Sequence, residues 1–318
     1  MDYRKIGIRV YQILGCTRHF SRTGLVIIGL IFPVACFSQI NSSRPGTILW
    51  EVSPRGNETL KSYILGTEHL YPGSLIDTIK EIKQGILTAD YVAGEGNIPE
   101  QEPIGFNPAT EKIPYKELLD DEDYSMVDRY LTEHGFRSLE EMDSARYPIG
   151  KLANYVFRDA GTQAFDLDPQ NEPSMDAYVQ KLARSHKIPY YALDSGLSIN
   201  DSVLAFGSSE FEFADFLVNF VKLSKDSLRA RYGRIQKMAS FDINYRFDEK
   251  SPQLDNNGIR YLLFVRNKYW LPKLKVILKE HKCFIAVGLD HLKYQSGLLW
   301  SLQSSGFIVK PVRIKSEQ

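Results

Sequence analysis

Short apolar runs and longer amphipathic segments alternate along this chain, a pattern typical of an α/β protein. The apolar runs predict strands at residues 48–52, 60–65, 190–193, 283–287 and 307–314, with a further short strand within 89–97. Pro54, Gly56 and Asn57 lie between the first two runs and predict a hairpin turn. The chain is therefore expected to build a central sheet that begins with a hairpin.

Other segments have apolar residues at helical spacing. The first is 75–87, where Ile76, Ile79, Ile82 and Ile86 lie on one face. Further helical patterns cover 115–134, 138–142, 149–158, 174–186, 198–237, 254–281 and 294–304. Pro272 is expected to kink or restart the helix of 254–281. Residues 98–113 and 240–253 read as loops.

Two apolar strands end in the same motif, Gly-x-x-His-Leu, more than 200 residues apart. The first motif is Gly66-Thr67-Glu68-His69 and the second is Gly288-Leu289-Asp290-His291. Glycine permits a sharp turn after a buried strand, and open α/β sheets place their sites at strand ends. We therefore expect a mixed sheet with two pseudo-duplicated strand-GxxH-helix units, separated by a large helical insertion. Both histidines are candidate site residues, and a structural role is the alternative for each.

Glu95 is the candidate carboxylate. It follows the strand within 89–97, which comes after the helix of 75–87, so the first strand-GxxH unit continues as a βαβ unit. Strand ends on one side of a parallel unit lie together, so Glu95 is expected near His69. Two imidazoles and a carboxylate suit a divalent metal with open positions for water and substrate. The alternative for Glu95 is a loop acid between two glycines, and Glu68 or Asp290 is a candidate for holding an imidazole in place.

These motifs resemble the TraB/GumN family, which includes the Tiki-type metalloproteases and is distantly related to erythromycin-esterase-like and ChaN-like proteins. The resemblance covers about residues 47–313. Its motifs are Leu49-Trp50, Gly66 to His69, Glu95 after Ala89-Asp90, Asp176-Ala177-Tyr178 through Pro189 to Leu193-Asp194, Arg266-Asn267 with Trp270, Gly288 to His291, Gly297-Leu298-Leu299, Gly306 and Pro311-Val312. Asp194 stands where many relatives have Glu, and Glu95 lies between two glycines rather than in an unbroken strand.

The resemblance implies a divalent-metal-dependent hydrolase that resembles a peptidase, with Mn²⁺ or Co²⁺ favoured and Zn²⁺ as an alternative. His69 and His291 are expected to be metal ligands. Glu95 is expected to be a ligand or the general base on metal-bound water. Arg266 is expected to bind a substrate carbonyl or carboxylate, and a salt-bridged helix arginine is its alternative. Two rival functions are a non-catalytic binder of secreted peptides and a metal-independent, esterase-like hydrolase.

The first 38 residues differ from the rest. Basic residues precede the apolar stretch of 24–37, and small residues lead to Gln39. We interpret 1–38 as a signal peptide, 39–46 as a linker and 47–318 as the α/β domain. The protein is expected to be exported to the periplasm or the extracellular space, with no membrane span after cleavage because the apolar run is short. A retained anchor and a lipidated Cys36 are the alternatives.

The charge balance and the cysteine content limit the classes of partner that the sequence allows. The chain of 318 residues carries 39 basic and 39 acidic residues, and removal of 1–38 takes away more bases than acids. An acidic balance argues against nucleic acid and leaves a peptide or a small molecule as the expected substrate. Basic residues in 222–237 are read as a solvated helix face. Cys283 is the one cysteine beyond residue 38 and is expected in the core. No pattern indicates an oligomeric state.

Overall fold

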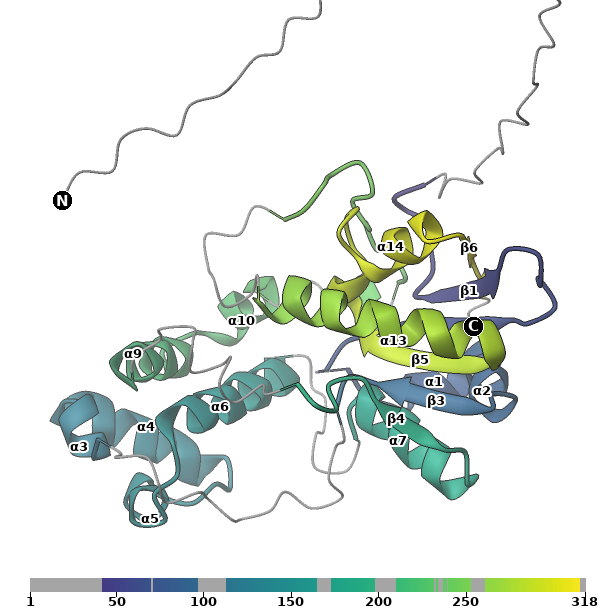
Figure 1. Cartoon of the computed structure of the whole chain (residues 1–318). Helices are drawn as coiled ribbons and strands as arrows, with labels where there is room; N and C mark the ends of the chain where they lie inside the picture. The colour runs from purple at the N-terminus through teal and green to yellow at the C-terminus, as the bar shows by residue number, and fades with distance from the viewer. Residues whose placement is uncertain are drawn as a thin grey trace, which may run out of the picture. The chain divides into compact units, whose positions relative to one another are not determined.

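The computed structural model describes residues 42–69, 71–96, 113–164, 173–197, 210–231, 233, 237–238, 240–252 and 261–314 (Figure 1). The proposed signal peptide, most of the loop at 98–113 and the segment at 198–209 lie outside these residues, as does the start of the linker. Within the described part of the chain, no helix has the length and apolar character needed to cross a membrane.

A mixed sheet of six strands confirms the predicted α/β class. The antiparallel hairpin consists of β1 (Leu49–Pro54) and β2 (Ser62–Thr67), with Trp50 opposite Ile64. The remaining strands are β3 (Tyr91–Gly94), β4 (Tyr190–Ala192), β5 (Cys283–Gly288) and β6 (Phe307–Pro311). Their order is β4-β3-β5-β2-β1-β6, in which β4, β3, β5 and β2 run parallel to one another. Strand β5 thus lies between β2 and β3, and all six of its residues are buried.

Helices pack on the sheet in two groups. Helices α1 (Leu75–Thr78), α2 (Lys80–Leu87) and α7 (Met175–Ser185) contact one another and the parallel strands. Helices α13 (Arg266–Glu280) and α14 (Leu298–Ser304) contact each other, and pack on β1 and β6 respectively. In Figure 1, α13 runs in front of β5. Cys283, the first residue of β5, is buried in the core, as expected.

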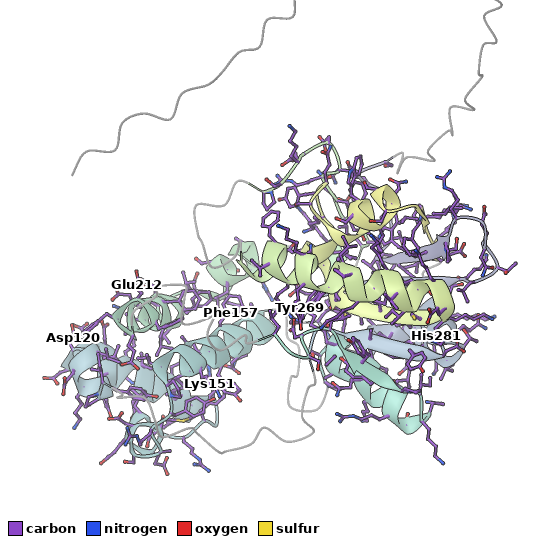
Figure 2. All side chains as sticks on the ribbon, in the orientation of Figure 1. Asp120, Lys151, Phe157, Glu212, Tyr269 and His281 are labelled. Carbon is purple, nitrogen blue, oxygen red and sulfur yellow. The ribbon has the colours of Figure 1, made fainter. Side chains whose placement is uncertain are left out.

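The helical insertion has a hydrophobic cluster of its own. Its described helices are α3 (Tyr115–Leu118), α4 (Asp121–Glu133), α5 (Leu139–Ser144), α6 (Ile149–Ala164), α9 (Glu210–Val221) and α10 (Lys225–Arg231). Buried Leu152 and Val156 of α6 and Leu217 of α9 belong to this cluster. Phe157 on α6 and Glu212 on α9 mark the same two helices in Figure 2.

Several predicted helices are divided in the structure. The segment 75–87 forms α1 and α2 because Ile79 has an extended backbone and is buried between them. The segment 115–134 forms α3 and α4, and the side chain of Asp120 accepts from the Asp123 N–H to start the second helix. A buried apolar residue contributes to the core from an extended backbone as well as from a helix, so periodicity alone misses such breaks.

Two boundaries near the second GxxH unit were also wrong. The helix does not restart at Pro272, since α13 continues through this residue. Pro272 is exposed, so water can reach the carbonyl that has lost its partner. A π-helical turn, Tyr261–Val265, precedes α13. The helix predicted at 294–304 starts only at Leu298, because Tyr294 has a left-handed backbone with φ of 67°.

Candidate active site

Parallel strands bring the candidate residues to one edge of the sheet. Thr67 at the end of β2 pairs with Gly288 at the end of β5, and β3 ends on the other side of β5 with Gly94. His69 and His291 follow β2 and β5, and Glu95 follows β3. The βαβ argument placed Glu95 near His69, and the two side chains do approach to 4.0 Å, although β5 lies between the strands that precede them.

Glu95 lies at the centre of the group. Its Oε1 accepts a hydrogen bond of 2.6 Å from the Gly288 N–H, and its Oε2 accepts one of 2.7 Å from Nη2 of Arg266. Burial opposes its charge, but His291, the Arg266 guanidinium, His69 and the Gly288 N–H together lower the pKa of Glu95 to about 2. Glu95 is therefore ionised at neutral pH and has both oxygens engaged, which is a poor state for a general base.

Arg266 joins two carboxylates. Besides Glu95, it donates from Nε and Nη2 to the two oxygens of Asp194, over 3.2 and 2.6 Å, in a fork-like pair. Asp194 also accepts from Nε1 of Trp270, and the guanidinium carbon lies 4.6 Å from the centre of that indole. Arg266 is buried, with its charge satisfied within the protein. Of the interpretations made from the sequence, this geometry is closer to the salt-bridged arginine than to one that faces a substrate.

His291 is a buried, neutral imidazole. Its Nδ1–H donates to Oδ1 of Asn267 over 2.7 Å, and the Asn267 amide donates back to the His291 carbonyl. The ring also packs against Trp270, with the ring centres 4.5 Å apart. Burial is the main cause that lowers the pKa of His291 to about 4. Its Nε2 thus carries the lone electron pair, which accepts a hydrogen bond of 3.4 Å from Nη1 of Arg266.

His69 has the opposite environment. Its side chain is 56% exposed, and its Nδ1–H donates to Oδ2 of Asp176 over 2.7 Å. The other oxygen of Asp176 accepts from the Thr67 hydroxyl over 2.7 Å. The Asp176 charge raises the pKa of His69 to about 9, although water weakens this attraction at an exposed ring. One imidazole is therefore neutral and buried, and the other favours a positive charge and faces solvent.

The Nε2 atoms of both histidines approach the same oxygen. Oε1 of Glu95 lies 4.0 Å from Nε2 of His69 and 3.7 Å from Nε2 of His291. Gly288 makes this approach feasible, because a Cβ added there would lie 3.0 Å from Oε1 of Glu95 and 3.3 Å from Nε2 of His69. Neighbouring donor atoms bound to one ion at about 2.1 Å are roughly 3–3.5 Å apart. The three residues therefore fit a divalent metal if these distances shorten by about half an ångström.

The described residues do not already form such a centre: no group of three or more His, Cys, Asp or Glu side chains among them is arranged to hold a metal ion. The gap has a visible cause, since Glu95 is bound to Arg266 and Gly288. The charge balance nevertheless favours a cation. Glu95 and Asp194 share one permanent positive charge, Arg266, and Asp176 pairs with His69, so the carboxylates outnumber the positive groups even when His69 is protonated.

Three site residues were not identified as such from the sequence, namely Asp176, Asp194 and Asn267. Asp194 follows β4 at the same sheet edge, and Asn267 is next to Arg266. Their positions in the sequence could therefore have identified both as candidate site residues. Asp176 lies in the first turn of α7, where an acidic residue is ordinary. Of the two acids considered as partners of the imidazoles, Asp290 instead pairs with Lys293 and Glu68 is buried.

The mixed sheet, with two histidines and a glutamate at one edge, defines an α/β protein with two GxxH motifs. The chain belongs to the TraB/PrgY/gumN family, whose model matches residues 48–311. Comparisons with curated proteins and with solved structures gave no match. The expected family is thereby confirmed over most of the chain.

Proposed function

We propose that this protein is a metal-dependent hydrolase in which His69, Glu95 and His291 hold one divalent ion. The observation that carries the proposal is the approach of two Nε2 atoms to a single carboxylate oxygen. Both Nδ1 atoms are occupied, by Asp176 and Asn267, so the Nε2 atoms are the ones left to bind an ion. Nε2 of His291 would exchange its hydrogen bond from Nη1 of Arg266 for the ion. Metal-binding histidines commonly have their second nitrogen fixed in this way.

The donor set fits several ions. Two imidazoles and a carboxylate suit Zn²⁺, Mn²⁺ and Co²⁺, with positions left for water and substrate. The family resemblance favours Mn²⁺ or Co²⁺. When bound, such an ion would polarise a substrate carbonyl and make a water molecule acidic enough to supply hydroxide near neutral pH.

The chain's own residues divide the remaining work. With its lowered pKa and two hydrogen-bond donors, Glu95 is suited to hold a cation rather than to take a proton. Arg266 keeps Glu95 and Asp194 in place from inside the protein. His69 is the most exposed of these side chains, so a substrate would approach from its side. The scissile bond would be an amide or ester, and the family resemblance favours a peptide.

Metal-independent hydrolysis is the second candidate, and the His69–Asp176 pair favours it. This pair resembles a His–Asp base whose Nε2 faces water. With a pKa of about 9, however, only about 1% of His69 would be neutral and able to act as a base at pH 7. A metal ion can displace this proton from Nε2 as it binds, whereas a base must start without it, so the metal-dependent proposal is the stronger one.

Metal binding and turnover should be measured together on the full chain. We expect the purified protein to bind one equivalent of Mn²⁺, Co²⁺ or Zn²⁺ by calorimetry, and the loaded protein to cleave members of a peptide library. His69→Ala and His291→Ala should each lose the ion while remaining folded. His186→Ala, which removes an exposed imidazole at the C-cap of α7, is the matched control and should behave as wild type.

Each rival has a distinct outcome in the same experiment. Turnover that survives chelation would favour the metal-independent hydrolase. Peptide binding without any product would favour the non-catalytic binder. Full metal occupancy in either histidine variant would remove that residue from the proposed ligand set. We further propose that the protein acts after export, on the basis of its charged and apolar first 38 residues.

A further inference from the structure

The two histidines are held by partners of different kinds. Asn267 contacts His291 twice, at the ring and at the carbonyl, and Trp270 packs against the same ring. His69 has one hydrogen-bonding partner on its ring in the described structure, Asp176, and its side chain is half exposed. The orientation of His69 therefore depends on a single carboxylate, whereas that of His291 has several supports.

Asp176 is itself held from the strand that leads to His69. Its Oδ1 accepts from the Thr67 hydroxyl and its Oδ2 from the His69 ring. Thr67 is buried at the end of β2, two residues before His69, and Asp176 is mostly buried on α7. Asp176 on α7 thus links the end of β2, through Thr67, to the ring of His69.

We propose that Asp176, fixed by Thr67, is the positioning residue of His69, and that it directs Nε2 of this ring toward Glu95. A carboxylate can only accept, so its bond to the ring keeps hydrogen on Nδ1 and leaves Nε2 to face the site. The Asp176 charge also favours a cation at the ring. The effect of Asp176 on metal affinity rests on the proposed function, but its effect on the orientation of the His69 ring does not.

The first test uses metal-free protein. With ¹⁵N-labelled histidine, the Nδ1–H proton of His69 should give a slowly exchanging, downfield signal, assigned by its loss in His69→Gln. Asp176→Ala should abolish it. Thr67→Val, which removes only the hydroxyl, should weaken it and keeps the test valid if Asp176→Ala does not fold. An unchanged His69 signal in both variants would overturn the proposal.

Asp77→Asn is the matched control. Asp77 hydrogen-bonds to Tyr178 on α7, so its substitution also removes a carboxylate contact with this helix. It does not contact His69, and the His69 signal should remain as in wild type. Loss of the signal in Asp77→Asn would mean that any disturbance of α7 releases the ring, and the specific role of Asp176 would be refuted.

The second test measures affinity for Zn²⁺ and Mn²⁺ by calorimetry. Loss of a group that orients a metal-bound histidine commonly costs about 10- to 100-fold in affinity, so Asp176→Ala should weaken binding by this factor and Asp77→Asn by less than about twofold. Asp176→Asn retains one acceptor oxygen and should give an intermediate loss. If wild type binds no metal but Asp176→Ala still releases the ring, the positioning role stands and the proposed function fails.

Discussion

Thr67 and Gly288 are paired across two adjacent parallel strands, and this pairing brings the two GxxH motifs together. The motifs are offset by one position, since Gly66 lies opposite Val287 rather than opposite Gly288. Each residue of the pair also supports the site directly. The Thr67 hydroxyl holds Asp176, and the Gly288 N–H holds Glu95. The sheet therefore sets both the spacing of the histidines and the position of the carboxylate between them.

Gly288→Ala should weaken metal binding with little loss of fold. Its backbone, at φ of −51° and ψ of 136°, is one that alanine adopts without strain. The new Cβ would instead lie 3.0 Å from Oε1 of Glu95 and 3.3 Å from Nε2 of His69, and would push these atoms apart. We expect an affinity loss of at least about 10-fold by calorimetry, in the range seen when ligands lose their orientation.

Gly96→Ala is the control for this substitution. An added Cβ at Gly96 meets nothing within 4 Å, although the residue is next to Glu95. Metal affinity and melting temperature should stay near wild type. Equal losses in the two alanine variants would show that this sheet edge tolerates no added side chain, and the argument from the specific contacts of Gly288 would be refuted.

Asn267→Ala should reduce stability more than Asp176→Ala. Asn267 bonds both the Nδ1–H and the carbonyl of buried His291, and water has little access to replace it. Leaving such buried groups unpaired costs about 1–3 kcal/mol. Asp176→Ala leaves one buried group, the Thr67 hydroxyl, without its partner, while water can replace Asp176 at exposed His69, so the cost there should be smaller. Urea unfolding of the metal-free variants measures both free energies of unfolding. A larger loss in Asp176→Ala than in Asn267→Ala would contradict this argument from burial.

Stability should fall in mild acid because His291 is buried in its neutral form. Its pKa is about 4 in the folded protein, against 6.5 for an ordinary histidine. Between these values the unfolded chain binds a proton that the folded protein does not, so the free energy of unfolding decreases as the pH falls. From pH 7 to pH 5 this contribution is about 2 kcal/mol. Metal-free wild type should lose this much more than His291→Gln, and equal losses would show that His291 is not the cause.

The pattern of the chain was sufficient to place three residues of the candidate site at strand ends. His69, His291 and Glu95 each follow a buried strand, and parallel strands place such ends at one edge. The insertion of β5 between β2 and β3 could not be foreseen, because it joins segments about 200 residues apart. The prediction that Glu95 lies near His69 assumed that β2 and β3 are adjacent, whereas β5 lies between them.

The partners of these residues could not be derived in the same way. Arg266 was expected to face a substrate, whereas the structure binds it to Asp194 and Glu95. Which carboxylate a guanidinium meets depends on how α13 packs against the β3 and β4 ends, and this is not encoded in local periodicity. Asp176 gave even less signal, since an acidic residue in the first turn of a helix is usual without any site.

The exported protein should begin near Gln39. Residues 1–38 combine a basic start, an apolar stretch and small residues before Gln39, which together predict cleavage by a signal peptidase. N-terminal sequencing of protein from the extracytoplasmic fraction checks the position. A lipid-modified Cys36 at the new terminus would favour the lipoprotein alternative, and a chain that starts at Met1 in the cytoplasm would refute export.

Glu95→Gln should impair both stability and metal binding. An amide of the same shape has one acceptor oxygen, while Glu95 receives donors on both sides, from Arg266 and from Gly288. The amide NH₂ must therefore face one of these donors, which should cost about 1–3 kcal/mol of stability. As a metal ligand the amide is also weaker than a carboxylate, so affinity should fall together with turnover.

Calorimetry, urea unfolding and peptide cleavage of Glu95→Gln, measured on the same preparation, separate these effects. If metal stays fully bound while turnover falls by about 10²–10⁴-fold, Glu95 acts as the general base despite its low pKa. If binding and turnover both match wild type, Glu95 is a structural acid and the proposed site lacks its carboxylate.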